Sequence, residues 1–357
     1  MRISFEASSL KKIKPTGVSR YIENLVGSML DSFSEDSFSL YYKLSRIKNR
    51  NNILQFNRCQ TKYYYNYLWP VFKDADIFHG LDGYVPNWKN VKKIVTIHDI
   101  ASIKLNREKI SSQKFMNKKL SNYNEVLKYV DAVVTVSEST KNDVAEYFNY
   151  DYKKIFVTHL GVGKNYYPRS VDSVSKILSK FSIDKNYLLF IGDLSARKNT
   201  TRMIKAYASS QKCKDMQFVF SGGVSYGGES SLQEIKNLGL ERNVKILNYV
   251  DNSDLPALYT GASGLVFPTL YEGFGLPILE SMACGTPVLT SNVGSAPEIG
   301  GKLAIYVDPY DIGAIADGID ALVNRTVGPR EDLINHANKF SWSRCAEKTF
   351  EVYRGGS

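Results

Sequence analysis

The stretch YEGFGLPILESMACGTPVL, residues 271–289, holds two carboxylates, Glu272 and Glu280, inside a run of glycines and apolar side chains. Two glycines closely follow Glu272 and disfavour a helix, whereas Pro277 is a favoured early helical residue. The pattern therefore predicts a loop through Gly275 and a helix from about Pro277. Glu272 then precedes the helix, and Glu280 lies in its first turn.

The residues after this helix predict a buried strand. Gly285 is expected to end the helix in the left-handed conformation, and PVLT, residues 287–290, forms a short apolar strand. A loop, helix and strand of this kind also occur in many proteins whose acids are simply solvated. The rest of the chain therefore has to decide whether the two glutamates have a function.

Short apolar runs alternate with helical stretches along the whole chain, which predicts parallel sheets covered by helices on both faces. The runs are RISFEAS, SFSLYYKL, DIFHG, KKIVTI, AVVTV and KIFVT in the first half, and NYLLFI, QFVF, NVKIL, GLVF, PVLT and LAIYV in the second. A polar stretch at 163–172 separates the two sets. The predicted fold class is α/β, with two Rossmann-like, doubly wound domains, 1–168 and 169–341, that face a cleft at the carboxyl ends of their strands.

Length and composition are those of a two-domain globular protein. The 357 residues are long for one core, and 43% of them are hydrophobic. The chain enters a strand-like run directly after Met1 and contains no run of eighteen apolar residues, so we expect a soluble, cytosolic protein. The four cysteines lack the spacing of a metal site and suit a reducing compartment.

The net charge of +10 is unevenly distributed. Up to Arg169 the chain has 27 Lys and Arg against 16 Asp and Glu, so the whole excess lies in the first half. One basic stretch runs from Lys104 to Lys128 and includes Arg107, Lys109, Lys114, Lys118 and Lys119. It is either a solvated helix face or a surface that attracts phosphate groups, as on anionic lipid.

Candidate site residues follow the predicted strands directly. His98 follows KKIVTI, Gly192 follows NYLLFI, and Tyr249-Val250 closes NVKILN. No G-x-G-x-x-G follows the first strand, so a dinucleotide cofactor is not indicated. Instead, Gly17 opens the next helix, where a glycine lets backbone N–H groups approach a ligand.

Taken in order, these segments resemble the retaining nucleotide-sugar glycosyltransferases of the two-Rossmann-domain fold (GT-B), specifically glycosyltransferase family 4. The opening stretch resembles the E-x7-E signature of that family, and GDLSARKNT, residues 192–200, resembles its strand-end segment with Arg-Lys. TIHDI, SEST, THLGV and LNYVDNSDL are similar to further family segments and occur in the same order. The resemblance covers nearly the whole chain.

The resemblance implies a role for each candidate residue. Arg197 and Lys198 would bind the diphosphate, Glu272 the hydroxyls of the transferred sugar, and Glu280 the nucleotide ribose. His98 would lie near the transferred sugar and its phosphate. The remaining donor-binding residues would be Gly17, Gly192, Tyr249, Val250, Phe274, Gly275 and Leu276.

These groups also bear on the need for a metal. Cations and helix-start N–H groups can meet the negative charge that develops on the leaving diphosphate, so we expect neither a metal nor a cofactor, and the nucleotide sugar is a substrate. Asp74-Ala75-Asp76 has the D-x-D spacing of metal-bound donors in another glycosyltransferase fold. It precedes a strand of the first domain, and we interpret both acids as turn residues.

Within the family, the chain most resembles bacterial mannosyltransferases that build surface polysaccharide (O-antigen) on a lipid carrier. The resemblance lies in TGVSRYIENL and in the succession of HG, VP and TIHDI along the chain. This implies a retaining, metal-independent enzyme that moves mannose from GDP-mannose onto a polyprenyl-diphosphate-linked glycan in lipopolysaccharide biosynthesis. It would lie at the cytoplasmic face of the inner membrane, held peripherally by its basic first domain. The family often returns its last helix, here about 342–354, to that domain.

Three alternatives stay open at this point. A family-4 transferase could use a UDP-, ADP- or dTDP-sugar, and a sugar-nucleotide 2-epimerase shares the same architecture. A non-enzymatic basic protein could bind a membrane or nucleic acid. The presence of Arg197, Lys198, Glu272 and Glu280 disfavours this last alternative, and no nucleic-acid partner is expected.

Overall fold

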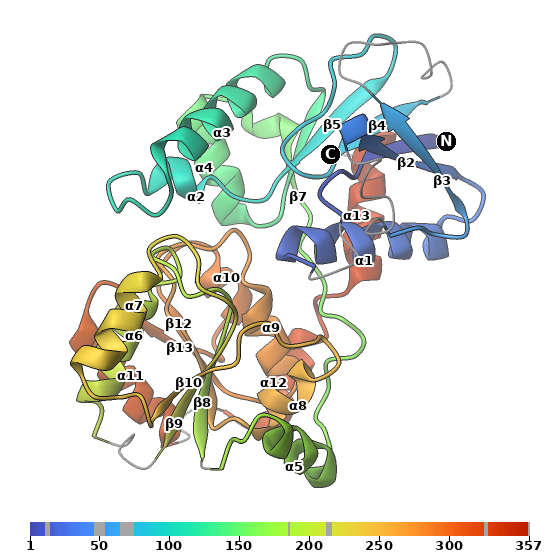
Figure 1. The fold of residues 1–357 in the computed structure, drawn as a ribbon. Coiled ribbons are helices and arrows are strands. Elements are labelled where there is room, and N and C mark those ends of the chain that lie inside the picture. The colour runs from blue at the N-terminus through green and yellow to red at the C-terminus, as the bar shows by residue number, and fades with distance from the viewer. Residues whose placement is uncertain are drawn as a thin grey trace. The chain divides into compact units, whose positions relative to one another are not determined.

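The computed structural model describes residues 1–10, 15–45, 54–64, 75–184, 186–211, 216–324 and 328–355. The chain folds into two compact units (Figure 1). Unit 1 contains Met1–Ile103, Gln113–Gly161 and Phe340–Ser357, and unit 2 contains Lys104–Ser112 and Val162–Lys339. The last helix of the chain therefore belongs to unit 1.

Unit 1 is built on a seven-stranded sheet in the order β3-β2-β1-β4-β5-β6-β7. All neighbouring strands are parallel. The strands are β1 (Arg2–Glu6), β2 (Ser37–Lys43), β3 (Cys59–Tyr64), β4 (Ile77–Gly80), β5 (Lys92–Ile97), β6 (Ala132–Thr135) and β7 (Ile155–Val157). The central strands β1, β4, β5 and β6 are largely buried, as expected of a parallel sheet with both faces covered, whereas β3 and β7 at the edges are partly exposed.

The helices of unit 1 begin where the sequence supplies caps. They are α1 (Gly17–Ser32), α2 (Ala101–Lys104, at the boundary with unit 2), α3 (Gln113–Val126), α4 (Glu138–Phe148), the short 3₁₀ helix η2 (Tyr152–Lys154) and α13 (Trp342–Arg354). Thr16, Ser137 and Ser341 cap α1, α4 and α13 by accepting from backbone N–H groups. α1 and α13 lie side by side in Figure 1, and the rings of Phe33 and Phe350 stack with centroids 3.7 Å apart.

A buried chain of polar side chains joins α13 to the sheet. Tyr21 Oη lies 2.9 Å from Thr96 Oγ1, which lies 2.8 Å from His79 Nε2, and His79 Nδ1 lies 2.7 Å from Tyr353 Oη. Tyr353 in turn donates to Met29 Sδ. If each hydroxyl donates toward the next group in this order, the proton of His79 sits on Nδ1 and every hydrogen has an acceptor.

Unit 2 repeats the pattern, as the sequence predicts. Its six parallel strands have the order β10-β9-β8-β11-β12-β13. They are β8 (Tyr187–Ile191), β9 (Gln217–Ser221), β10 (Val244–Ile246), β11 (Gly264–Phe267), β12 (Val288–Ser291) and β13 (Ile305–Val307). The order reverses between β8 and β11, and loops that leave the carboxyl ends of two such strands enclose a crevice.

Eight helices are described in unit 2. They are α5 (Val171–Lys180), α6 (Thr200–Ser209), α7 (Glu229–Asn237), α8 (Leu255–Gly261), α9 (Leu276–Ala283), α10 (Ala296–Gly300), α11 (Ile312–Val323) and α12 (Arg330–Ala337). α9 and β12 form the helix and strand expected from residues 271–289, and Gly285 has the predicted positive φ, +72°. Among the described residues of both units, none of the helices is long and apolar enough to cross a membrane.

Candidate functional site

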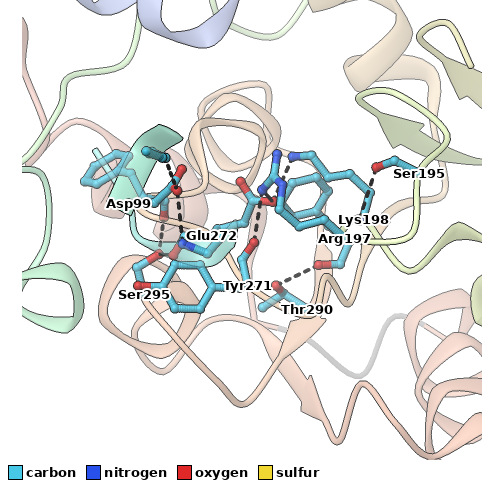
Figure 2. Close-up of polar contacts among 12 residues, drawn as sticks. Asp99, Ser195, Arg197, Lys198, Tyr271, Glu272, Thr290 and Ser295 are labelled. Atoms are coloured by element: carbon cyan, nitrogen blue, oxygen red, sulfur yellow. Dashed lines mark hydrogen bonds and ion pairs between the residues drawn. The ribbon is translucent and has the colours of Figure 1, made fainter. Parts of the chain in front are cut away.

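A cluster of three charged side chains lies at the point where the second sheet reverses its strand order (Figure 2). Arg197 and Lys198 come from the loop after β8, and Glu272 comes from the loop after β11. Arg197 Nη1 and Lys198 Nζ each lie 2.8 Å from the same oxygen, Glu272 Oε1. Arg197 also donates to the carbonyl of Tyr271 at 3.0 Å. The structure thus brings together three of the four residues predicted to be catalytic.

The two cations differ in their exposure to solvent. Arg197 keeps 31% of its side-chain surface exposed, whereas Lys198 keeps 12%. Burial lowers the pKa of the Lys198 ammonium, and the Glu272 carboxylate partly offsets this effect. The cluster has two positive charges and one negative charge, so it suits an anion that can replace or share the contacts of Glu272.

Gly192 lies beside the side chain of this lysine. A Cβ atom at Gly192 would lie 3.4 Å from Lys198 Cε, and the φ of Gly192, +137°, disfavours any other residue. The ammonium of Lys198 also lies 4.7 Å from the ring centroid of Phe267. The backbone conformation therefore favours glycine here, and whether Gly192 also contacts a donor remains a prediction.

Hydrogen bonds to two of its backbone carbonyls fix the conformation of the loop before α9. Ser295 Oγ lies 2.9 Å from Glu272 O and 2.8 Å from Phe274 O, and Ser295 is fully buried. Gly275 adopts φ +96° and precedes the first helical residue, Leu276. The predicted loop and helix start are thus confirmed to within one residue, and the amino terminus of α9 lies beside Glu272 in the chain.

Glu280 occupies a different position from the one expected. It is the fifth residue of α9, at the start of the second turn and not in the first, because the helix begins one residue earlier than expected, at Leu276. Its side chain is buried, and Tyr259 Oη donates to Glu280 Oε2 at 2.8 Å. Local sequence rules set the helix start but carry no signal for this tyrosine, which comes from α8.

The segment after β10 offers one exposed ring. Tyr249 is 40% exposed, whereas the side chain of Val250 is buried. A ligand at this strand end would therefore meet the ring of Tyr249 and the backbone of Val250. Contact of either residue with a nucleotide remains a prediction.

Two predicted site residues, Gly17 and His98, belong to unit 1. Gly17 is the first residue of α1, and a Cβ atom there would meet nothing within 4 Å. Among the described residues, a side chain at this position would therefore meet open space.

His98 follows β5 and has a fixed tautomer. Its Nε2 lies 2.9 Å from the carbonyl of Leu81, and because a carbonyl only accepts, Nε2 carries the proton. The ring meets Tyr21 edge-on, with centroids 4.7 Å apart. Burial lowers the pKa of His98, so near neutral pH its Nδ1 is a hydrogen-bond acceptor without a proton.

Lys119, from the basic stretch, and Asp76, from the D-x-D sequence, each have a charged partner. Lys119 is not part of a free basic surface, because it pairs with Asp99 Oδ1 at 3.0 Å and lies against the ring of Tyr123. Asp76 accepts from the backbone and side chain of Arg2 at the amino-terminal end of the sheet, and this contact lowers the pKa of its carboxyl. Asp74 lies outside the described residues.

The comparisons with known proteins identify the family. Residues 16–165 match the family described as Glycosyltransferase Family 4, and residues 175–340 match Glycosyl transferases group 1. The chain belongs to glycosyltransferase family 4 and has the GT-B fold of two Rossmann-like domains.

Individual relatives agree with this assignment. The chain is 31% identical to the O-antigen chain mannosyltransferase B of Escherichia coli, over 97% of this chain and 94% of that protein. Among solved structures it is similar to sucrose-phosphate synthase from Thermosynechococcus elongatus, with a TM-score of 0.80, 20% identity and coverage of 99% and 98%. It is also similar to Anabaena HepE in complex with UDP and glucose, with a TM-score of 0.75, 18% identity and coverage of 99% and 100%.

Proposed function

We propose that this glycosyltransferase transfers mannose from GDP-mannose to a lipid-linked glycan, with retention of the anomeric configuration and without a metal. The observation that carries the proposal is the Arg197–Lys198–Glu272 cluster at the switch point of the second sheet. Two cations that share one carboxylate oxygen suit a diphosphate, whose own oxygens can take over these contacts.

The chemistry follows from this cluster. The bond between the anomeric carbon and the diphosphate oxygen breaks, and the negative charge left on the diphosphate meets Arg197 and Lys198. The acceptor oxygen attacks from the same face of the sugar and gives its proton to the departing phosphate oxygen. Glu272 then interacts with sugar hydroxyls, Glu280 with the ribose, and the Nδ1 atom of His98 accepts from a donor hydroxyl.

One finding supports mannose as the transferred sugar, and a second supports a nucleotide-sugar donor in general. The relative that aligns with nearly the whole chain is named as a mannosyltransferase, the O-antigen chain mannosyltransferase B. The structure of HepE, which has the same fold, contains UDP and glucose. Neither protein fixes the nucleotide used here. The identity of the sugar, mannose, and of the nucleotide, GDP, is therefore the part of the proposal that experiment has to address first.

The test is a thermal-shift screen of the purified protein against GDP, UDP, ADP and dTDP sugars. A ligand at 100 times its Kd raises the stability of the state it binds by about 2.7 kcal/mol, so the true donor should raise the melting temperature clearly. NMR of the product formed on a mannose-terminated acceptor then reports the anomeric configuration. A shift by UDP-glucose alone, or an inverted product, would contradict the donor or the mechanism.

Metal independence has its own test. Activity should survive saturating EDTA, because Arg197, Lys198 and the amino terminus of α9 supply the positive charge. Loss of turnover with EDTA and its restoration by Mg²⁺ or Mn²⁺ would show that a metal carries the diphosphate instead.

The acceptor side of the proposal is a membrane-bound glycan reached from the cytoplasmic face of the inner membrane. On α3, Lys114 and Lys118 are exposed, and Phe115 between them is 55% exposed. Lysines that flank an exposed aromatic ring suit the surface of an anionic bilayer, where the ring enters the interface and each cation contributes about 1 kcal/mol.

A further inference from the structure

Asn199 follows Arg197 and Lys198 directly and has an unusual environment. It adopts the left-handed conformation, φ 62° and ψ 24°, immediately before α6, and only 3% of its surface is exposed. It makes no side-chain cap for the helix. Instead, its Nδ2 donates to the carbonyl of Pro268 at 2.9 Å and to the carbonyl of Pro309 at 2.7 Å.

The chemistry of the neighbours fixes which end of the amide faces which group. The two carbonyls can only accept, so the nitrogen must face them. The oxygen, Asn199 Oδ1, then accepts from Arg202 Nη1 at 3.1 Å. Three hydrogen bonds thus use both amide hydrogens and the amide oxygen, and no other side chain of this size supplies two donors and one acceptor in one plane.

These bonds connect three strand ends. Pro268 directly follows β11, Pro309 lies two residues beyond β13, and Asn199 closes the loop after β8. The same loop is held on its other side by backbone bonds, from Leu194 N to Gly223 O at 2.8 Å and from Ala196 N to Tyr226 O at 3.1 Å. The loop that carries Arg197 and Lys198 is therefore fixed at two places. Backbone hydrogen bonds hold its first part to the segment after β9, and the side-chain amide of Asn199 holds its end to the segments after β11 and β13.

A third contact supports this arrangement. The carbonyl of Arg197 accepts from the backbone N–H of Leu270 at 3.1 Å, so the backbone of the cation pair is tied to the loop that carries Glu272. The side-chain bond of Asn199 to Pro268 joins the same two loops. The relative position of Arg197, Lys198 and Glu272 thus depends on bonds made by a residue that is not itself charged.

We propose that Asn199 is a positioning residue for the diphosphate site: its amide fixes the loop that presents Arg197 and Lys198 to the donor. The inference rests on the proposed function, because it presupposes that the two cations bind a nucleoside diphosphate. It adds a residue for which no role is otherwise expected, and it predicts that loss of the amide weakens diphosphate binding although both cations are still present.

The test compares Asn199→Gly with the parent by calorimetric titration of GDP, UDP, ADP and dTDP. Glycine keeps the left-handed backbone and removes only the amide. The preferred nucleotide should bind the variant about tenfold more weakly, since small displacements of positioned groups are costly. Asn199→Asp keeps the shape but places an acceptor against two carbonyls, and it should weaken binding at least as much.

A double-mutant cycle separates positioning from a general effect on folding. In a Lys198→Met background, Asn199→Gly should change nucleotide affinity by clearly less than in the parent, because the residue acts through the missing cation. Equal effects in both backgrounds would overturn the inference. The matched control is Asn149→Gly, another left-handed asparagine, at the end of α4, which should leave nucleotide affinity unchanged.

The failure of the inference can be told from the failure of the proposed function. If the parent binds none of the four nucleotides, the proposed function is wrong, and the inference that presupposes it is wrong as well. If the parent binds one of them and both Asn199 variants bind it equally well, the positioning role alone is wrong. Circular dichroism and melting temperatures confirm that each variant is folded at the temperature of the titration.

Discussion

Glu272 has a second task besides any contact with the sugar, because it is the counterion of two cations. Its Oε1 atom lies 2.8 Å from both Arg197 Nη1 and Lys198 Nζ. Burial lowers the pKa of Lys198, and Glu272 is the first of the charges that raise it again. Replacement of this glutamate therefore changes the charge state of its neighbour as well as the contact itself.

Glu272→Gln should lower kcat at pH 7.5 and should make the donor KM rise more steeply between pH 7.5 and 9.5 than it does in the parent. Without the carboxylate the pKa of Lys198 falls further, so the ammonium is lost at a lower pH, while the phosphates stay ionised throughout this range. Steady-state kinetics at several pH values provide the measurement. An unchanged pH dependence would show that Glu272 does not hold the charge of Lys198.

Glu280→Gln is the natural comparison. Glu280 accepts a hydrogen bond from Tyr259 and lies outside the Arg197–Lys198–Glu272 cluster, so the donor KM should rise at every pH, by a factor equivalent to about 1–2 kcal/mol, with no change in slope. Calorimetry with free nucleotide checks the effect on binding. Parent-like affinity would remove Glu280 from the ribose site.

His98 is expected to act in its neutral form. Its Nε2–H donates to Leu81, and burial keeps its pKa below the usual 6.5, so the neutral ring offers Nδ1 as an acceptor. The value of kcat should therefore fall toward low pH with a midpoint below the usual 6.5, where Nδ1 gains a proton. A pH–rate profile with an acid limb at or above about pH 7 would contradict this assignment.

A pair of substitutions tests the same point by geometry. The amide of Asn reaches about as far as Nδ1, whereas the amide of Gln reaches about as far as Nε2. His98→Asn should consequently retain more kcat than His98→Gln if Nδ1 is the working atom. The reverse order would indicate that the hydrogen bond to Leu81 matters more than Nδ1.

At the scale of single elements, α3 carries the test for membrane binding. The double substitution Lys114→Gln and Lys118→Gln should weaken binding to vesicles that contain anionic lipid. Phe115→Ala should weaken this binding further. Donor binding should not change. Lys119 is left intact, because its charge is used by Asp99. The measurement is vesicle sedimentation at low and high salt. If the variants bind vesicles as well as the parent at low salt, α3 is not the membrane-binding surface.

The elements also show what the sequence could and could not predict. The start of α9 and the turn at Gly285 follow from local rules for proline and glycine, and both were confirmed. The partner of Glu280 and the carbonyls held by Asn199 come from other strands and helices. Their proximity depends on the strand order β10-β9-β8-β11-β12-β13, which no local pattern encodes.

The Arg197–Lys198–Glu272 cluster was predicted only in part from the sequence. The family resemblance singled out Arg197, Lys198 and Glu272, and the structure brings them together. The family resemblance did not indicate that both cations would contact one carboxylate oxygen. That contact depends on the hydrogen bonds that fix the loops after β8 and β11 relative to each other. The basic stretch in α3 was less well predicted, since the charge pattern does not distinguish the exposed Lys118 from the paired Lys119.

At the scale of the whole molecule, unit 1 should be sensitive to acid through His79. The ring is fully buried, and burial lowers its pKa to about 3, whereas in the unfolded chain it is near 6.5. The unfolded state therefore binds a proton below about pH 6.5 that the folded state does not. Stability is fully present above that pH and is lost as the pH falls.

Between pH 7 and pH 5 the free energy of unfolding of unit 1 should fall by about 2 kcal/mol more in the parent than in His79→Gln. The two tryptophans among the described residues, Trp88 and Trp342, both belong to unit 1, so their fluorescence in urea reports on the unfolding of this unit. The glutamine variant should be less stable at pH 7 because it interrupts the polar chain to Tyr353. Equal acid sensitivity of both proteins would mean that other groups control it.

The return of α13 to unit 1 has a consequence for synthesis on the ribosome. α1 buries Tyr21, Leu25 and Met29, and α13, which packs beside it, follows in the sequence only after the main segment of unit 2. At about 5–20 residues per second, translation from Val162 to the end of α13 at Arg354 takes roughly 10 to 40 s. Throughout that time the nascent first domain lacks its last helix while the second domain is completed. The emerging chain thus presents an apolar helix face that chaperones can bind, and a message truncated before Trp342 would yield a product whose first half stays open to proteases.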